Sequence, residues 1–189
     1  MLSGLSKVLL SPGLTRRGFL GLAASALLLG AEREEPFCSE EPKERRLCLV
    51  NMNTRERFEG VFWRDGDYDL DALQKLNVLL RDHHTEKVAE FDPRLFDLLC
   101  RLDESMNTRN ELEVISGYRS PRTNAQQRRR TRRVARQSLH MEAKAVDVRI
   151  PDVPTRQLRR AAMALRGGGV GSYRRSTYIH LDVGPVRIW

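Results

Sequence analysis

The chain has 189 residues, of which 40% are hydrophobic and 31% are charged, and its formal net charge is +8. This composition excludes a disordered chain or a membrane-embedded one, and the length suits one domain rather than two. The charge favours an anionic environment, such as nucleic acid, lipid headgroups or an acidic wall polymer. Cys38, Cys48 and Cys100 show no CxxC spacing, which argues against a cysteine-built zinc site. Cys38 and Cys48 could pair after export, whereas Cys100 is interpreted as a small core residue.

The first 31 residues are predicted to be a twin-arginine export signal. Arg16 and Arg17 precede Gly-Phe-Leu, and an uncharged apolar run follows at residues 22–30. This order is typical of signal peptides, and the paired arginines resemble the signal that twin-arginine export machinery reads. We therefore expect a periplasmic protein, which would stay anchored to the membrane if the signal were not cleaved. An ordinary secretory signal or a buried helix is the alternative.

Residues 32–46 are predicted to be a linker, because they are charged, contain prolines and lack apolar periodicity. One folded domain is expected at 47–189. It begins with two strand candidates, 47–52 and 57–63, which a polar turn joins into a hairpin. Asp69 can cap the helix that follows.

A second helix and a strand are predicted next along the chain. Pro93 can start the helix. Its expected inward positions follow helical spacing: Leu95, Leu98, Leu99 and Leu102. The strand candidate 111–116 ends at Gly117, where glycine allows the chain to turn. Arg119 is thereby delivered at a strand end.

The segment 145–150 alternates between apolar residues and others, which predicts a strand with Asp147 pointing away from the apolar layer. A helix ending at Leu165 is expected after it, with Thr155 or Asp152 as its cap. The glycines that follow the helix are interpreted as a flexible turn.

The last strand candidate is 178–183, in which His180 and Asp182 share one face. Helices mixed with short strands predict an α+β fold, with a small antiparallel sheet flanked by helices.

Three of these residues form a candidate metal site. His140 lies seven residues before Asp147, so a short turn could return its imidazole above the strand face. If the strand of His180 pairs beside the strand of Asp147, all three side chains meet. Two histidines and one carboxylate suit zinc and leave a fourth position open for water. The pair His83-His84 is interpreted as solvated surface, because no convergent ligands surround it.

Three motifs carry a family resemblance: SGYRS at 116–120, the SLH and AVD triplets of 138–147, and YIHLD at 178–182. Their order and spacing resemble the murein endopeptidase K family. That family is similar to the zinc D-alanyl-D-alanine peptidases, which share a fold with the hedgehog signalling domain. The resemblance extends over about 47–189, and twin-arginine signals are also common in the family.

The resemblance implies zinc bound by His140, Asp147 and His180, with Arg119 as a substrate contact. It also implies that the partner is peptidoglycan, whose peptide cross-links the family cuts during remodelling of the cell wall. Arg119 offers a planar double donor for a substrate carboxylate, and a structural ion pair is its alternative. One departure is Ala143, where the wider group usually has glycine, so the turn must tolerate a methyl group.

The general base is the second departure. The wider group commonly has an acid or a histidine two or three residues before the last ligand, where this chain has Tyr178 and Thr177. Neither is a good base at neutral pH. Asp182 is the candidate catalytic residue, because it lies on the face of His180 and could deprotonate water. It could instead orient a ligand or pair with Arg119, and we favour that supporting role.

Two other functions compete with a zinc peptidase. The arginine-rich run 128–136 could neutralise nucleic-acid phosphates, but no aromatic residue interleaves with it. Because an exported protein seldom meets nucleic acid, we expect a solvated face or a contact with anionic wall or lipid. The other alternative is a wall-binding module that keeps zinc on a peptidase scaffold without catalysis.

Overall fold

The computed structural model describes residues 43–189, except residue 109 and the pairs 132–133 and 174–175. The predicted export signal and Cys38 lie outside these described residues. Within them, no helix is both long enough and apolar enough to cross a membrane.

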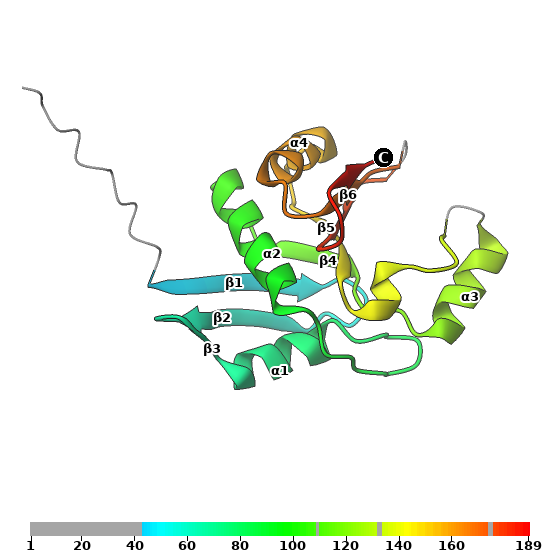
Figure 1. Ribbon diagram of the computed structural model, residues 1–189, viewed down its shortest axis with the longest axis horizontal. Coiled ribbons are helices and arrows are strands. Elements are labelled where there is room, and N and C mark those ends of the chain that lie inside the picture. The colour runs from blue at the N-terminus through cyan, green and yellow to red at the C-terminus, as the bar shows by residue number, and fades with distance from the viewer. Residues whose placement is uncertain (1–42, 109, 132–133, 174–175) are drawn as a thin grey trace, which may run out of the picture. The chain divides into compact units, whose positions relative to one another are not determined.

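Eight strands form one sheet (Figure 1). Their bounds are β1 Glu44–Asn51, β2 Arg57–Arg64, β3 Asp67–Tyr68, β4 Leu112–Ser116, β5 Ala145–Arg149, β6 Gly169–Gly171, β7 Ile179–Asp182 and β8 Arg187–Ile188. The order across the sheet is β3-β2-β1-β4-β5-β7-β6-β8. Together with the helices described below, this sheet confirms the predicted α+β class.

The predicted small antiparallel sheet is confirmed only in part, because the sheet has eight strands and two of its strand pairs are parallel. β1 pairs with β4 in parallel, and β6 pairs with β8 in parallel, while the other neighbours are antiparallel. Two helices lie between β3 and β4 in the chain and provide the long crossover that a parallel pair requires. The pattern within a single strand carries no information about such a crossover.

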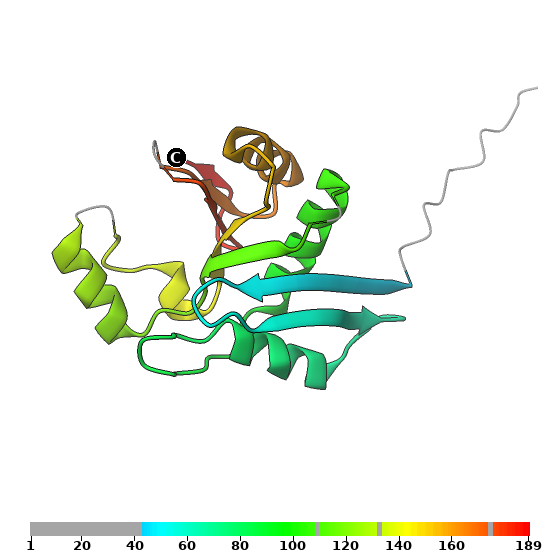
Figure 2. The same cartoon turned by 180° about the vertical axis from the view of Figure 1, so that it is seen from behind.

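Four α-helices and one short 3-10 helix complete the described chain: α1 Leu70–Leu79, α2 Pro93–Met106, α3 Pro121–Arg130, η1 Leu139–Glu142 and α4 Thr155–Leu165. Figures 1 and 2 show α1 and α2 together on one face of the sheet. The inward leucines predicted for α2 are all buried, and so is Cys100. Cys48 is half-buried, and both cysteines are free thiols.

The helix caps follow the sequence in part. Asp69 accepts a hydrogen bond from the backbone N–H of Ala72 and caps α1, as predicted. The prediction for α4 is wrong, because Pro154 occupies the cap position and no side chain caps the helix. Asp152 instead lies in the preceding turn with a left-handed φ of 63°.

The first strand begins at Glu44, inside the segment predicted to be a linker. Arg45 explains why these residues join the fold. Its guanidinium lies 2.8 Å from the carboxylate of Asp97 on α2 and 4.2 Å from the ring centre of Trp63 on β2. These contacts hold the start of β1 against both neighbouring elements.

Candidate metal centre

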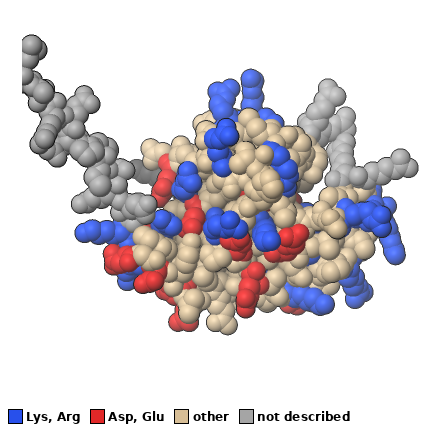
Figure 3. All heavy atoms as spheres, in the orientation of Figure 1, with Lys and Arg blue, Asp and Glu red and all other residues tan. Residues whose placement is uncertain are grey.

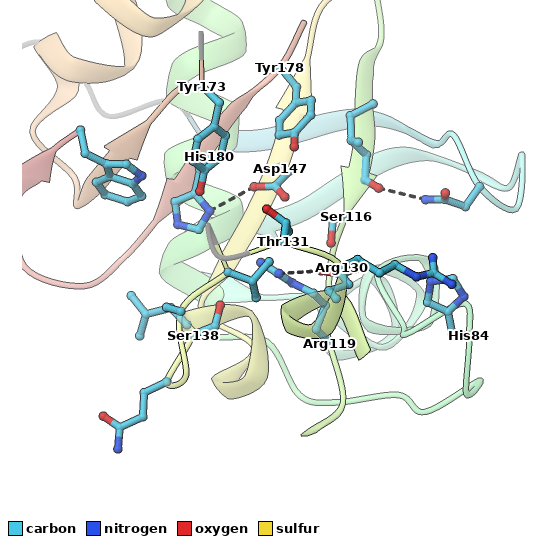
Figure 4. Close-up of a pocket in the computed structure, with 18 of the residues that line it drawn as sticks. His84, Ser116, Arg119, Arg130, Thr131, Ser138, Asp147, Tyr173, Tyr178 and His180 are labelled. Carbon is cyan, nitrogen blue, oxygen red and sulfur yellow. Dashed lines mark hydrogen bonds and ion pairs between the residues drawn. The ribbon is translucent and has the colours of Figure 1, made fainter. Parts of the chain in front are cut away.

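The predicted pairing of the strands that carry Asp147 and His180 is confirmed. β5 and β7 are antiparallel neighbours, and Asp147 lies directly opposite His180 in their register. Side chains at directly opposite positions project from the same face of a sheet. The ladder therefore places a carboxylate beside an imidazole, as Figure 4 shows.

His140 reaches the same face from η1, through a tight turn at Ala143. Ala143 adopts a left-handed φ of 52° and is 2% exposed, so the turn accepts the methyl group where the wider group usually has glycine. The backbone N–H of Lys144 donates to the carbonyl of Leu139, and that of Asp92 donates to the carbonyl of Ala143. These bonds hold the turn that returns His140 above β5.

Three side-chain atoms converge within hydrogen-bond distances. Nε2 of His140 lies 3.1 Å from Nδ1 of His180 and 3.3 Å from Oδ1 of Asp147. The distance from Nδ1 of His180 to Oδ1 of Asp147 is 3.0 Å. His140 is fully buried, whereas the side chains of Asp147 and His180 are 13% and 10% exposed. The described part of the chain thus contains a buried group of three side chains that could hold a metal ion.

The outer nitrogen of each imidazole fixes which ring nitrogen carries a proton. Nδ1 of His140 lies 2.7 Å from the carbonyl oxygen of Gly117, and Nε2 of His180 lies 2.9 Å from Oδ2 of Asp182. Because carbonyls and carboxylates only accept hydrogen bonds, both outer nitrogens donate. In the neutral rings, the inner nitrogens therefore carry lone pairs. Two lone pairs and a carboxylate facing one another form a donor set for a cation.

Burial and charge set the protonation of this cluster. Burial lowers the pKa of His140 below its ordinary value, which favours the neutral ring. Burial alone would raise the pKa of Asp147, but the two histidines outweigh it and the pKa is lowered. For His180, burial is outweighed by hydrogen bonds with Asp147 and Asp182, so its pKa is raised. Asp147 therefore remains an anion.

Asp182 is fully buried behind His180, and its carboxylate accepts five hydrogen bonds. The donors are the backbone N–H groups of Gly169 and Gly184 at 3.1 and 2.8 Å, both terminal nitrogens of Arg187 at 3.0 and 2.8 Å, and Nε2 of His180. Burial would raise the pKa of Asp182, but these donors lower it to about 2. Asp182 is not among the residues that line the adjoining cavity.

A cavity of about 870 Å³ opens onto the cluster through Asp147 and His180. Of the described residues that line it, Asp147 is the only one with an acidic side chain. Figure 4 shows the hydroxyl of Tyr178 directed toward Asp147 and that of Tyr173 toward His180. Burial and then the charge of Asp147 raise the pKa of Tyr178, so its hydroxyl stays protonated and can donate.

Arg119 lines the same cavity. Its backbone N–H donates to the carbonyl of His140, and its Nη1 donates to Oε1 of Gln127 at 2.9 Å. Its Nε is buried without a hydrogen-bond partner, and no described acidic residue forms an ion pair with it. Burial lowers the pKa of Arg119. The structural ion pair considered for Arg119 is therefore not formed among the described residues.

The expectation that His83 and His84 are solvated holds in part. His84 is exposed and His83 is half-buried, yet both line the cavity. The neighbouring Asp82 is 1% exposed and explains their position. It accepts hydrogen bonds from the backbone N–H of His84 at 3.0 Å, the backbone N–H of Ser120 at 2.9 Å and the hydroxyl of Thr123 at 2.6 Å. Asp82 thus joins the histidine loop to the start of α3.

The fold and this cluster define a class of protein, an α+β protein with a candidate metal site beside one face of its sheet. Comparison with known proteins narrows the class. The sequence model of the family described as peptidoglycan L,D-endopeptidase MepK matches residues 39–189. The chain belongs to this family, which confirms the resemblance drawn from its motifs.

Individual relatives agree with the family assignment. The probable peptidoglycan L,D-endopeptidase MepK of Haemophilus influenzae is 45% identical over 149 residues, covering 78% of this chain and 80% of the relative. The peptidoglycan L,D-endopeptidase MepK of Escherichia coli strain K12 is 39% identical over 175 residues, covering 92% of this chain and 96% of the relative. The protein of the same name from Shigella flexneri matches to the same extent.

Proposed function

We propose that this chain is a zinc-dependent murein endopeptidase that cleaves L,D-peptide cross-links of peptidoglycan during remodelling of the cell wall. Family membership makes it a peptidoglycan peptide hydrolase. One observation carries the proposal of a metal: two imidazole nitrogens and one carboxylate oxygen converge within 3.3 Å of one another. The predicted twin-arginine signal and the substrate of the relatives support a periplasmic location.

His140, Asp147 and His180 would hold the zinc ion. Two imidazole nitrogens and one carboxylate oxygen fit zinc better than magnesium or calcium, which prefer sets of oxygen ligands. A zinc ion held there would supply Lewis-acid chemistry, which activates water and polarises a peptide carbonyl. The protein's own contribution is to orient these ligands and the substrate.

We assign Asp182 the role of a positioning residue, with a general base as its alternative. Its carboxylate already accepts five hydrogen bonds, and it lies outside the cavity wall. A buried carboxylate that accepts the outer N–H of a ligating histidine holds the ring orientation and raises its basicity. Asp182 therefore acts on the reaction through His180.

Arg119, Tyr173 and Tyr178 would orient the substrate. The guanidinium of Arg119 lies in the cavity wall without an acidic partner among the described residues, so it can bind a stem-peptide carboxylate. The tyrosine hydroxyls lie beside Asp147 and His180 (Figure 4), which form with His140 what we call the ligand cluster. They can donate hydrogen bonds to the oxygen of the amide being cut.

Isolated peptidoglycan tests this function. The purified chain is incubated with it, with and without a zinc chelator, and the released fragments are separated by chromatography and identified by mass spectrometry. We expect chelator-sensitive cleavage of L,D cross-links. The variant His180→Ala should lose bound zinc and all cleavage, while the matched variant His84→Ala should retain one zinc per chain. Cleavage at the parent rate by His180→Ala would refute the proposed metal centre.

The alternative is a wall-binding module that keeps zinc without catalysis. The lining of the cavity supports it, because its described residues include no carboxylate other than the proposed ligand Asp147. No second carboxylate is therefore present among these described residues to act as a general base. The same incubation separates the two functions. A chain that retains zinc and binds peptidoglycan but releases no fragments would select the binding module.

A further inference from the structure

A long segment of the chain carries positive charge without any negative charge. Residues 114–141 contain eight arginines and no aspartate or glutamate. α3 occupies the middle of this segment, and its last turn contains Arg128, Arg129 and Arg130. With Arg136, these residues form what we call the arginine face. All four are exposed, and Figure 3 shows basic side chains gathered at the end of the molecule where α3 lies.

Helix stability does not account for the arginine face. The negative end of a helix dipole favours a cation in the last turn. The helices α1, α2 and α4 form without any basic residue there, so three arginines in the last turn of α3 exceed what helix formation requires. Like charges on neighbouring residues repel one another, although solvent weakens the effect. No described acidic residue forms an ion pair with any of the four side chains. The charge is therefore available to an external anion.

The arginine face is continuous with the cavity. Arg130, Thr131, Val134 and Ala135 line the same cavity as the ligand cluster. Figure 4 shows Arg130 and Arg119 on the wall that faces Asp147. A polymer whose cross-link occupies the cavity would therefore extend over the arginine face. Peptidoglycan stem peptides carry carboxylates at regular intervals, which complements this charge.

Two other anionic partners fit the face less well. A helix that binds membranes needs an apolar side to insert into the lipid. None of the exposed large hydrophobic residues in the described chain lies between residues 121 and 136. Proteins that bind single-stranded nucleic acid interleave aromatic residues with basic ones, and residues 119–172 contain no phenylalanine, tyrosine or tryptophan.

We propose that the arginine face binds carboxylates of the stem peptides that flank the cross-link in the cavity. This proposal rests on the proposed function, because it takes peptidoglycan as the polymer in the cavity. The face adds affinity for the assembled wall, while the chemistry stays at the ligand cluster. Its contribution should be electrostatic and therefore sensitive to salt.

A pair of double variants tests the arginine face. Arg128→Gln/Arg129→Gln removes two of its charges without altering a residue that lines the cavity. Arg156→Gln/Arg160→Gln removes two exposed charges from α4, which lines no part of the cavity, and serves as the matched control. Binding to purified sacculi is measured by co-sedimentation. Turnover is measured separately on a soluble cross-linked muropeptide dimer.

We expect the α3 variant to bind sacculi about fivefold more weakly than the parent, as loss of two exposed ion pairs implies. The α4 variant should bind like the parent. The difference should vanish at about 0.5 M salt, where charges are screened within a few ångströms, and on sacculi whose carboxyl groups have been amidated. Turnover of the soluble dimer should be unchanged in both variants.

Equal binding of the two double variants to sacculi would overturn the proposal. So would a parent chain that binds amidated sacculi as tightly as untreated ones. The third such result comes from co-sedimentation with vesicles of phosphatidylglycerol and phosphatidylcholine: the α3 variant binds the vesicles more weakly than the parent but binds sacculi equally well. Failure of the proposed function is distinguishable. A parent chain that leaves the soluble dimer uncut would refute catalysis, and the binding comparison would still report on the arginine face.

Discussion

Replacing Asp182 with asparagine separates the two roles considered for this buried carboxylate. The amide offers one oxygen and one NH2 group where the carboxylate offers two acceptors. If the amide oxygen faces His180, the NH2 group meets the backbone N–H groups of Gly169 and Gly184 and Nη1 of Arg187. If the amide is turned round, the NH2 group opposes Nε2–H of His180 and favours a proton on Nδ1, which faces the ligand cluster. Either orientation disturbs the site.

The magnitude follows from the contacts that are lost. Each buried donor left without a partner costs about 1–3 kcal/mol, and the side chain of Arg187 is 42% exposed, which reduces its share. We therefore expect Asp182→Asn to lower the free energy of unfolding by about 2–4 kcal/mol. Loss of a carboxylate behind a ligating histidine weakens metal affinity about 10- to 100-fold.

The assay combines zinc affinity, stability and turnover. Zinc affinity is measured by competition with a chromogenic chelator, and stability is measured by urea unfolding with and without zinc. Arg187→Gln is the control, because it removes two of the five donors to Asp182 and leaves the hydrogen bond with His180 intact. The control should retain zinc more tightly than Asp182→Asn. A variant Asp182→Asn that binds zinc like the parent and yet cleaves no peptidoglycan would refute the positioning role and favour a general base.

Three further substitutions probe the surroundings of the cluster. Asp82→Asn should lower the free energy of unfolding by about 3 kcal/mol at neutral pH, measured with urea, because buried backbone and hydroxyl donors lose their acceptor. Burial would raise the pKa of Asp82, but those donors lower it. The stabilisation by Asp82 is therefore present above the ordinary pKa of an aspartate and is lost as pH falls through the lowered pKa. A parent chain whose free energy of unfolding does not fall in acid would contradict this. Gly117→Ala would place a Cβ 2.3 Å from the carbonyl oxygen of Leu80, so the backbone must move at a cost of about 1–3 kcal/mol in stability, measured by thermal unfolding. Because the carbonyl of Gly117 accepts from His140, zinc titration should also show weaker binding. Unchanged stability and zinc affinity would show that the backbone moves without cost. Tyr178→Phe should lower kcat about 100-fold with zinc content unchanged, and parent-like turnover would remove its hydroxyl from the reaction.

The meeting of Asp147 and His180 could be predicted from sequence, because alternation within a strand fixes which face a side chain takes. Asp147 and His180 lie at alternating positions of two strands, and pairing those strands brings them together. The left-handed turn at Ala143 then decides where His140 points. Apart from His180, the donors to Asp182 could not be predicted, because they come from β6, the turn at Gly184 and β8.

Other elements lack the signals on which sequence interpretation depends. α3 has no continuous apolar side, so the only sequence pattern that indicates a helix is its cap, Ser120 followed by Pro121. β6 contains two glycines and one valine and shows no alternation. The glycines before it are packed rather than flexible, since a Cβ on Gly168 would lie 1.8 Å from the carbonyl oxygen of Asp182. Close packing of backbone against backbone leaves no hydrophobic pattern.

The convergence of His140, Asp147 and His180 also has a consequence for biosynthesis. The folded chain holds the carboxylate of Asp147 and two imidazole nitrogens within 3.3 Å of one another, so an ion bound there would stabilise the folded state by mass action. Twin-arginine machinery moves chains that are already folded. If the chain leaves by that predicted route, its cofactor would be selected from the cytoplasmic metal pool before export, rather than from the metals available outside the inner membrane.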